Sequence, residues 1–208
     1  MYLPGHFRMD EAAEMHRLVR QYPLGTWVLS TEQGLQAHHL PFWLDTEAGE
    51  HGCLRAHVAR ANPVWQQLDG RAGLVIFQST DAYVTPAWYP SKREHGKVVP
   101  TWNYSAVHVQ GTARAIEDRD WLHHLVQQLT DTREAEQAQP WRVSDAPDDY
   151  IERMLGAIVG IEITVTAWLG KRKAGQNRTA PERAGLAQGL RERGLRGEDL
   201  PWLSADDA

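Results

Sequence analysis

The sequence predicts a mainly β protein in which helices lie at the periphery of an antiparallel barrel. Six or seven segments have strand character, they follow one another along the chain with hairpin-like connections, and only four segments have helical spacing. Such an order is typical of antiparallel barrels, because parallel strands need a long crossover between them. The clearest strand is 159–167, where Val159, Ile161, Ile163 and Val165 alternate with polar residues, so one of its faces is predicted to be solvated or at an interface.

The first segments predict a helix and then a hairpin. Asp10 can cap an amphipathic helix that ends at Pro23 and Gly25. The segments 26–30 and 35–44 flank a turn-like Thr-Glu-Gln-Gly tetrapeptide and are predicted to pair. A third strand is expected at 52–58.

In that third strand the two-residue period predicts that Arg55 and His57 project together. A short helix is expected directly after it, because Asn62 is a good N-cap and Pro63 suits the first helical position. With Arg60 just before, the start of this helix is a plausible anion pocket.

A basic segment lies in the middle of the chain. A buried central strand is expected at 72–78 and a long strand at 103–116. Between them, the stretch from Tyr83 to Tyr104 places cationic side chains and a histidine between two aromatic clusters, which predicts a stiff strand and loop that holds a flat, charged ligand.

The second half adds three helices. One begins at Asp118 and exits through the polar stretch 131–139, and a short one covers 148–155. The last is expected at about 180–193, introduced by a capping box, and the tail from Leu195 is predicted to be loosely held.

Composition restricts the class of protein. The 208 residues predict a single globular domain, 1–208, and the apolar fraction of 42% with no long apolar run predicts no membrane span. The N-terminal residues lack a secretory h-region, so a cytoplasmic protein is expected. A single cysteine, Cys53, excludes an internal disulfide and is expected to be a small buried residue. The net charge of −5 argues against direct DNA binding.

Several familiar chemistries are absent. No His-x-x-x-His or Cys-x-x-Cys spacing predicts a metal site, and there is no Gly-x-Ser-x-Gly elbow, Walker loop or Gly-x-Gly-x-x-Gly fingerprint. What remains is a dispersed set of cations and amides among aromatic residues. These are the types that a flavin mononucleotide (FMN) needs, because its phosphate takes Arg, Lys, hydroxyl or amide donors and its ring takes flat apolar walls. For each group alone, a solvated face or loop is the ordinary interpretation.

Five motifs together resemble one family. The start Met-Tyr-Leu-Pro-Gly-His-Phe, the segments 57–63 and 83–90, the block 95–104 and the segment 173–178 are similar to the PaiB-type proteins, which are described as FMN-binding negative transcriptional regulators or regulators of protease synthesis and sporulation. The resemblance covers about residues 1–190. It implies an FMN-binding split β-barrel of the pyridoxamine-phosphate-oxidase kind, assembled as a homodimer with flavin sites near the subunit boundary.

The resemblance also implies site residues. Arg60 and Asn62 match the strand-to-helix region that meets the phosphate in split-barrel flavoproteins. The other cofactor-binding candidates fall in two signature segments: Lys97, Thr101 and Asn103, then Lys173, Gln176 and Asn177. Gly175 departs from the family pattern, which usually has Ser before the Gln-Asn pair. The catalytic residues are unknown, and the later two segments could equally serve dimerisation.

Three functions stay open. The leading one is a flavoprotein that acts as an oxidoreductase, in which FMN carries the electron chemistry. The second is a negative regulator of transcription that acts through a partner or metabolite. The third is haem binding or degradation, with His57, His95 and His108 as axial candidates. Trp168 is predicted to pack at the dimer boundary or over the ligand.

Overall fold

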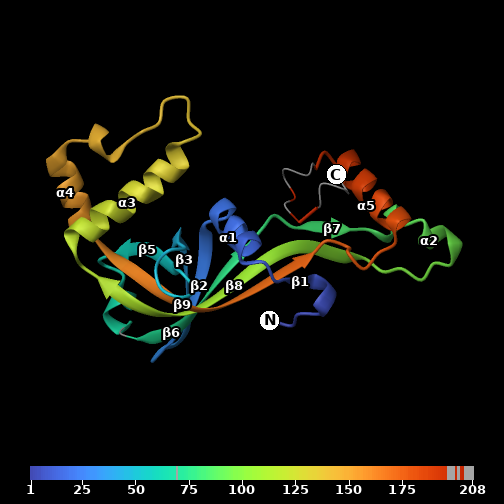
Figure 1. Ribbon diagram of the computed structural model, residues 1–208, viewed down its shortest axis with the longest axis horizontal. Helices are drawn as coiled ribbons and strands as arrows, with labels where there is room; N and C mark the ends of the chain where they lie inside the picture. Colours follow the sequence, from blue (N-terminus) through green and yellow to red (C-terminus); the bar gives the residue numbers. More distant parts are fainter. Residues whose placement is uncertain (69, 196–199, 201, 204–208) are drawn as a thin grey trace. The chain divides into compact units, whose positions relative to one another are not determined.

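The computed structural model describes residues 1–68, 70–195, 200 and 202–203 of the chain (Figure 1). Its strands are β1 (Arg8–Met9), β2 (Leu24–Thr31), β3 (Gly34–Pro41), β4 (Trp43–Asp45), β5 (Cys53–Ala59), β6 (Arg71–Gln78), β7 (Ala82–Val84), β8 (Thr101–Ile116) and β9 (Ile158–Lys173). Its α-helices are α1 (Ala12–Gln21), α2 (Ser91–Glu94), α3 (Arg119–Glu134), α4 (Asp148–Gly156) and α5 (Ala180–Glu192). Short 3-10 helices are η1 (Gly5–Phe7), η2 (Pro63–Gln67), η3 (Pro86–Trp88) and η4 (Val143–Asp145). The prediction of a mainly β protein with few helices is confirmed.

The strands form one sheet with the order β3-β2-β6-β8-β9-β5-β4, to which β1 adds beside β9 and β7 beside β8. All pairings with a defined register are antiparallel. The chain divides into two compact units: unit 1 comprises Met1–Leu18, Phe77–His108 and Leu169–Ala208, and unit 2 comprises Val19–Ile76 and Val109–Trp168. The single domain over residues 1–208 stays a prediction.

Unit 2 contains the predicted hairpin, with β2 paired to β3 from Leu24 opposite Pro41 to Thr31 opposite Gly34. The segment 35–44 is not one strand, however. β3 ends at Pro41, which has no amide hydrogen for the ladder, and the chain resumes as β4, which pairs with β5 instead of β2. This change of partner brings β4 to the end of the sheet order.

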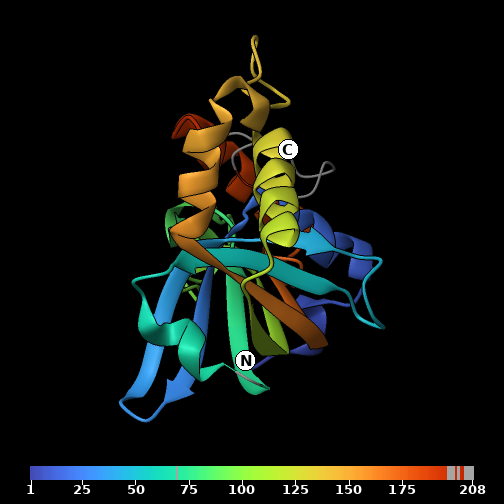
Figure 2. The ribbon, with the colours of Figure 1, turned by 90° about the vertical axis from the view of Figure 1, so that its left-hand side faces the viewer.

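Two helices lie side by side in unit 2, as Figure 2 shows for α3 and α4. The side chain of Asp118 caps α3 by accepting from the amide of Trp121 at 2.8 Å, as the sequence predicts. Leu122 and Leu125 form the buried face of this helix, and α3 contacts β4. Gly160 on β9 leaves room for the Trp121 ring, because a Cβ at this position would collide with it.

Unit 1 has its own core beside α5. Buried Tyr89, Leu186, Leu190 and Trp202 belong to one apolar cluster. The capping box predicted at the start of α5 is present between Thr179 and Glu182. The expectation of a loosely held tail from Leu195 lies largely outside the described residues, and of those that are described Leu200 and Trp202 are buried. No described helix is long and apolar enough to cross a membrane.

Candidate functional site

The predicted site residues fall into two groups, one in each unit. Arg60 and Asn62 belong to unit 2, whereas Lys97, Thr101, Asn103, Lys173, Gln176 and Asn177 belong to unit 1. We describe each group by itself.

One cationic group in unit 1 lies where β8 begins and β9 ends. Lys173 Nζ donates to Thr101 Oγ1 at 2.5 Å. Lys171, two residues earlier on the same face of β9, holds its ammonium 5.4 Å from the centre of the Tyr104 ring. We call these four residues, Thr101, Tyr104, Lys171 and Lys173, the lysine face.

The lysine face has unbalanced positive charge. Partial burial, and then the nearby charge of Lys171, hold the pKa of Lys173 below its ordinary value, although the Tyr104 side chain opposes this shift. Within the part of the chain that the structure describes, no carboxylate lies within ion-pair distance of either lysine. Two ammonium groups and a hydroxyl with no anion beside them are the donor set that a phosphate needs.

Two exposed aromatic rings lie on β7 and at the start of β8. Tyr83 on β7 is paired with Trp102 on β8, and their ring centres are 5.7 Å apart in an edge-to-face arrangement. Trp102 is 54% exposed, and by strand alternation it shares the outward face of β8 with Tyr104. An exposed indole of this kind gives a flat ligand an apolar wall. The lysine face and these rings therefore fit a phosphorylated, planar group such as FMN.

The other candidates in unit 1 have different surroundings. Asn103 is buried on the inward face of β8, and its Nδ2 has no hydrogen-bond partner among the described residues. Gln176 is held by the backbone, since its Oε1 accepts from Ala174 N at 2.8 Å and its Nε2 donates to the Arg172 carbonyl at 2.5 Å. Lys97 and Asn177 are exposed.

Gly175, which departs from the family pattern, adopts a backbone conformation that favours glycine. Its φ is +81°, in the left-handed region that glycine adopts without steric cost. A side chain at this position would be strained, whatever hydroxyl contact it offered.

In unit 2, Asn62 caps η2 as predicted, with its Oδ1 accepting from Val64 N at 3.1 Å. Arg60 is engaged within the unit: Nε donates to the Gly156 carbonyl at 2.9 Å, and Nη1 lies 2.5 Å from Glu117 Oε2. Because η2 spans five residues and its cap uses one amide, few free amides remain there. Phosphate binding by Arg60 and Asn62 stays a prediction.

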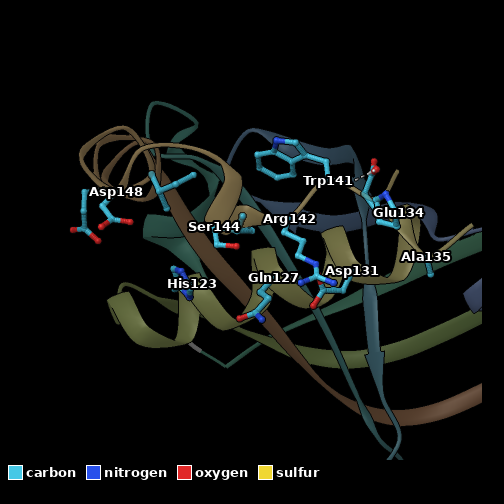
Figure 3. A pocket seen from close by; sticks show the side chains of 13 residues that line it. His123, Gln127, Asp131, Glu134, Ala135, Trp141, Arg142, Ser144 and Asp148 are labelled. Carbon is cyan, nitrogen blue, oxygen red and sulfur yellow. Dashed lines mark hydrogen bonds between the residues drawn. The ribbon is translucent and has the colours of Figure 1, made fainter. Parts of the chain in front are cut away.

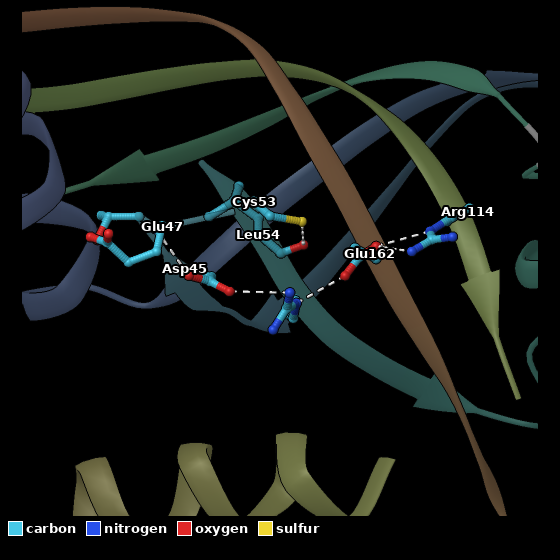
Figure 4. Close-up of polar contacts among 8 residues, drawn as sticks. Asp45, Glu47, Cys53, Leu54, Arg114 and Glu162 are labelled. Atoms are coloured by element: carbon cyan, nitrogen blue, oxygen red, sulfur yellow. Dashed lines mark hydrogen bonds and ion pairs between the residues drawn. The ribbon is translucent and has the colours of Figure 1, made fainter. Parts of the chain in front are cut away.

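Arg55 lies on the same face of β5 as His57, as the strand period predicts. It is bound by Asp45 and by Glu162, and Figure 4 shows Asp45, Glu162 and Arg114 in this charged cluster. Glu162 lies on the polar face of β9, which the sequence predicts to be solvated or at an interface, yet it is buried within unit 2 at 7% exposure. The ionic partner from a distant strand explains the difference, because it makes burial of the carboxylate tolerable. Cys53, beside this cluster, is buried as predicted.

The three histidines proposed for haem differ in setting. His95 is exposed and accepts from Lys97 N at 3.0 Å. Burial lowers the pKa of His57 and of His108, so both rings favour the neutral form. No group of three or more His, Cys, Asp or Glu side chains in the described residues could hold a metal ion. Trp168 is half-buried and donates to the His51 carbonyl, and its place at a dimer boundary or over a ligand stays a prediction.

Among the cavities of unit 2, sequence reasoning missed two that share part of their walls. The larger, about 840 Å³, lies among α3, η4 and α4, and Figure 3 shows Asp131, Glu134, Arg142 and Asp148 around it. The smaller, about 490 Å³, shares Glu134 and Trp141 with the larger and is lined mainly by apolar residues. The walls of the smaller cavity come from segments far apart in the chain, whereas the larger is lined by residues between His123 and Glu152, where only the packing of α3, η4 and α4 creates the hollow.

Comparison with known proteins supports one family and one fold. Residues 1–167 match the family described as "Putative FMN-binding domain". Protease synthase and sporulation protein PAI 2 of Bacillus subtilis is 34% identical over 180 residues, which cover 86% of this chain and 83% of that protein. An uncharacterized protein of Saccharomyces cerevisiae is 39% identical over 155 residues, which cover 64% of this chain and 90% of that protein.

Among solved structures, the FAD and heme binding protein from Mycobacterium smegmatis superposes with a TM-score of 0.61 at 18% identity, covering 88% of this chain and 80% of that one. This likeness concerns the fold, which is a split barrel like that of the pyridoxamine-phosphate-oxidase-like proteins, as the sequence resemblance implies.

Proposed function

The chain belongs to the FMN-binding domain family of the Bacillus sporulation protein, and from this premise we propose that it binds FMN, with the phosphate on the lysine face. The observation that carries the proposal is the pair Lys171 and Lys173, two ammonium groups without a carboxylate partner in the described part of the chain. A dianionic phosphate would relieve their repulsion and accept a hydrogen bond from the Thr101 hydroxyl.

The aromatic pair gives the isoalloxazine a place beside the phosphate. Tyr83 on β7 and Trp102 on β8 present exposed ring surface, and β8 also carries Thr101 of the lysine face. Bound FMN would supply the electron chemistry of an oxidoreductase. The residues of this chain bind and orient the cofactor, and none of those near the lysine face is assigned as an acid, base or nucleophile.

Titration with FMN and with riboflavin tests the proposal, because the two differ only in the phosphate. Quenching of flavin fluorescence gives both affinities for the full chain and for Lys173→Met. We expect the variant to lose about tenfold or more in FMN affinity, the usual effect of one charge-assisted contact, and to leave riboflavin affinity unchanged. Lys92→Met, which changes an exposed lysine of α2, is the matched control and should bind FMN normally.

Two results would overturn the assignment. If Lys173→Met binds FMN as the unaltered chain does while Arg60→Ala weakens it, the phosphate lies at the unit 2 group instead. A Soret band in the freshly purified protein, without flavin absorbance, would favour the haem alternative.

Two further parts of the proposal have their own measurements. A homodimer is expected, and the mass in solution tests it. Regulation of transcription is the alternative role, and a gel shift that persists at physiological salt would support direct DNA contact, since non-specific contacts fade as salt rises.

A further inference from the structure

The smaller cavity of unit 2 has the size and walls of a small-molecule site. Its volume of about 490 Å³ falls within the usual range for ligand pockets. Buried Phe42 and Leu44 form part of the wall, together with Trp43 and Leu129. None of these residues belongs to the lysine face or to the Arg60 group. An apolar body is therefore the part of a ligand that this cavity would enclose.

Two arginines give the cavity a positive side. Arg20 at the end of α1 and Arg133 at the end of α3 both line it, and Arg133 Nη2 donates to the Arg20 carbonyl at 2.6 Å. Neither guanidinium forms an ion pair within the residues that the structure describes. The cavity's one carboxylate, Glu134, accepts from the amide of Trp141 at 3.0 Å. The lining therefore carries a net positive charge, which complements an anion.

His57 contributes a polar group to the otherwise apolar interior. Its Nδ1 is buried without a hydrogen-bond partner in the described part of the chain. Burial lowers the pKa of this imidazole, so at neutral pH the ring adds no charge next to the apolar walls. The positive charge of the cavity thus resides on the two arginines alone.

We propose that this cavity binds a small organic acid with an apolar body, whose carboxylate lies against the guanidinium groups of Arg20 and Arg133. The apolar walls select a ligand with an apolar body, and the two arginines select a carboxylate as its head group. The proposal does not depend on flavin binding, because it uses other residues.

Calorimetric titration of the full chain with octanoate and phenylacetate, each beside its neutral amide, tests this proposal. Each acid should bind at least about tenfold more tightly than its amide, because the guanidinium contacts are charge-assisted. The double variant Arg20→Gln/Arg133→Gln should lose this preference. The control Arg17→Gln/Arg153→Gln changes exposed arginines of α1 and α4 outside the cavity and should keep it.

A second test fills the cavity with a larger side chain. Leu129→Phe, or Thr130→Trp if the former does not fold, should abolish acid binding, whereas Leu35→Trp on the exposed surface of β3 should not. The proposal fails if neither acid binds at millimolar concentration, if acid and amide bind equally, or if the preference survives in the double arginine variant. Binding undiminished by the filled cavity would place the acid elsewhere and overturn it too.

Discussion

Arg55 on β5 and Glu162 on β9 are register partners whose side chains meet inside unit 2, with Arg55 Nε donating to Glu162 Oε2 at 2.9 Å. The second carboxylate oxygen of Glu162 accepts from Arg114 Nε, also at 2.9 Å. On its other side, the Arg55 guanidinium lies 5.3 Å from the centre of the Trp43 ring. One buried carboxylate thus holds two cations, and the network joins β4, β5, β8 and β9.

Removal of the Glu162 charge should destabilise the protein. In Glu162→Gln, Arg55 stays largely buried without its main counter-ion, and we expect a loss of about 3 kcal/mol in the free energy of unfolding. Urea denaturation followed by tryptophan fluorescence measures this loss. The control Glu152→Gln breaks the exposed pair with Arg119 and should cost at most about 1 kcal/mol. Equal, small losses in both variants would show that the buried network contributes little.

The same carboxylate predicts how stability depends on pH. Burial alone would raise the pKa of Glu162, but the hydrogen bonds and charges of Arg114 and Arg55 outweigh it and bring the pKa below the ordinary value of 4.5. A carboxyl group whose pKa is lower in the folded than in the unfolded protein stabilises the fold at any pH above the pKa of the unfolded state. This contribution is lost as the pH falls through the pKa of the folded state. The unfolding free energy should therefore fall as pH drops below about 4.5, and less steeply in Glu162→Gln. Parallel pH profiles for the two proteins would contradict this.

Cys53 should be unreactive in the folded protein. Burial and then the charge of Glu162 raise the pKa of its thiol to about 12, so little thiolate exists at pH 8. Alkylation by iodoacetamide, followed by mass spectrometry, should be on the order of a hundredfold slower in the native protein than in urea. Because Cys53 is the only cysteine, the labelled mass reports on this site alone. Similar rates in both conditions would mean that β5 opens readily.

Local patterns in the sequence predicted the elements well. The β2–β3 hairpin, the Asp118 cap and the capping box of α5 each depend on residues close together in the chain, and the structure contains all of them. Periodicity also predicted the apolar side of β9. These features follow from backbone geometry and short-range hydrogen bonds, so no knowledge of distant segments is needed.

Contacts between distant segments could not be predicted in the same way. Glu162 is buried because Arg55, 107 residues away, lies opposite it. Lys173 meets Thr101 across 72 residues, and only the pairing of β8 with β9 brings them together. The resemblance identified Thr101 and Lys173 as site candidates, but the contact between their side chains could not be predicted from it. The cavity around His57 likewise exists only when five segments, 19–23, 41–44, 57, 129–134 and 141, are in place.

Gly185 should not tolerate a side chain. A Cβ at this position of α5 would collide with the backbone carbonyl oxygen of Trp88 in η3, so one of the two elements must shift. We expect Gly185→Ala to cost about 1–3 kcal/mol in thermal unfolding, despite the better helix propensity of alanine. Gly156→Ala is the control, since a Cβ there meets nothing within 4 Å, and it should be neutral or slightly stabilising. A stabilised Gly185→Ala would mean that α5 is free to move away from η3.

Trp202 should anchor the end of the chain to the core of unit 1. Its ring is 1% exposed, and its Nε1 donates to the Thr80 carbonyl at 2.9 Å. We expect Trp202→Ala to reduce the free energy of unfolding by about 3–5 kcal/mol, because a large cavity would be left beside Tyr89 and Leu190. Trp202→Phe keeps most of the packing and loses only the hydrogen bond, so its cost should be smaller, about 1–2 kcal/mol. Trp141→Ala, which removes a 44% exposed ring, serves as the control for loss of an indole. If Trp202→Ala and Trp141→Ala have the same free energy of unfolding, Trp202 contributes nothing to the core. That result would agree with the prediction of a loosely held tail.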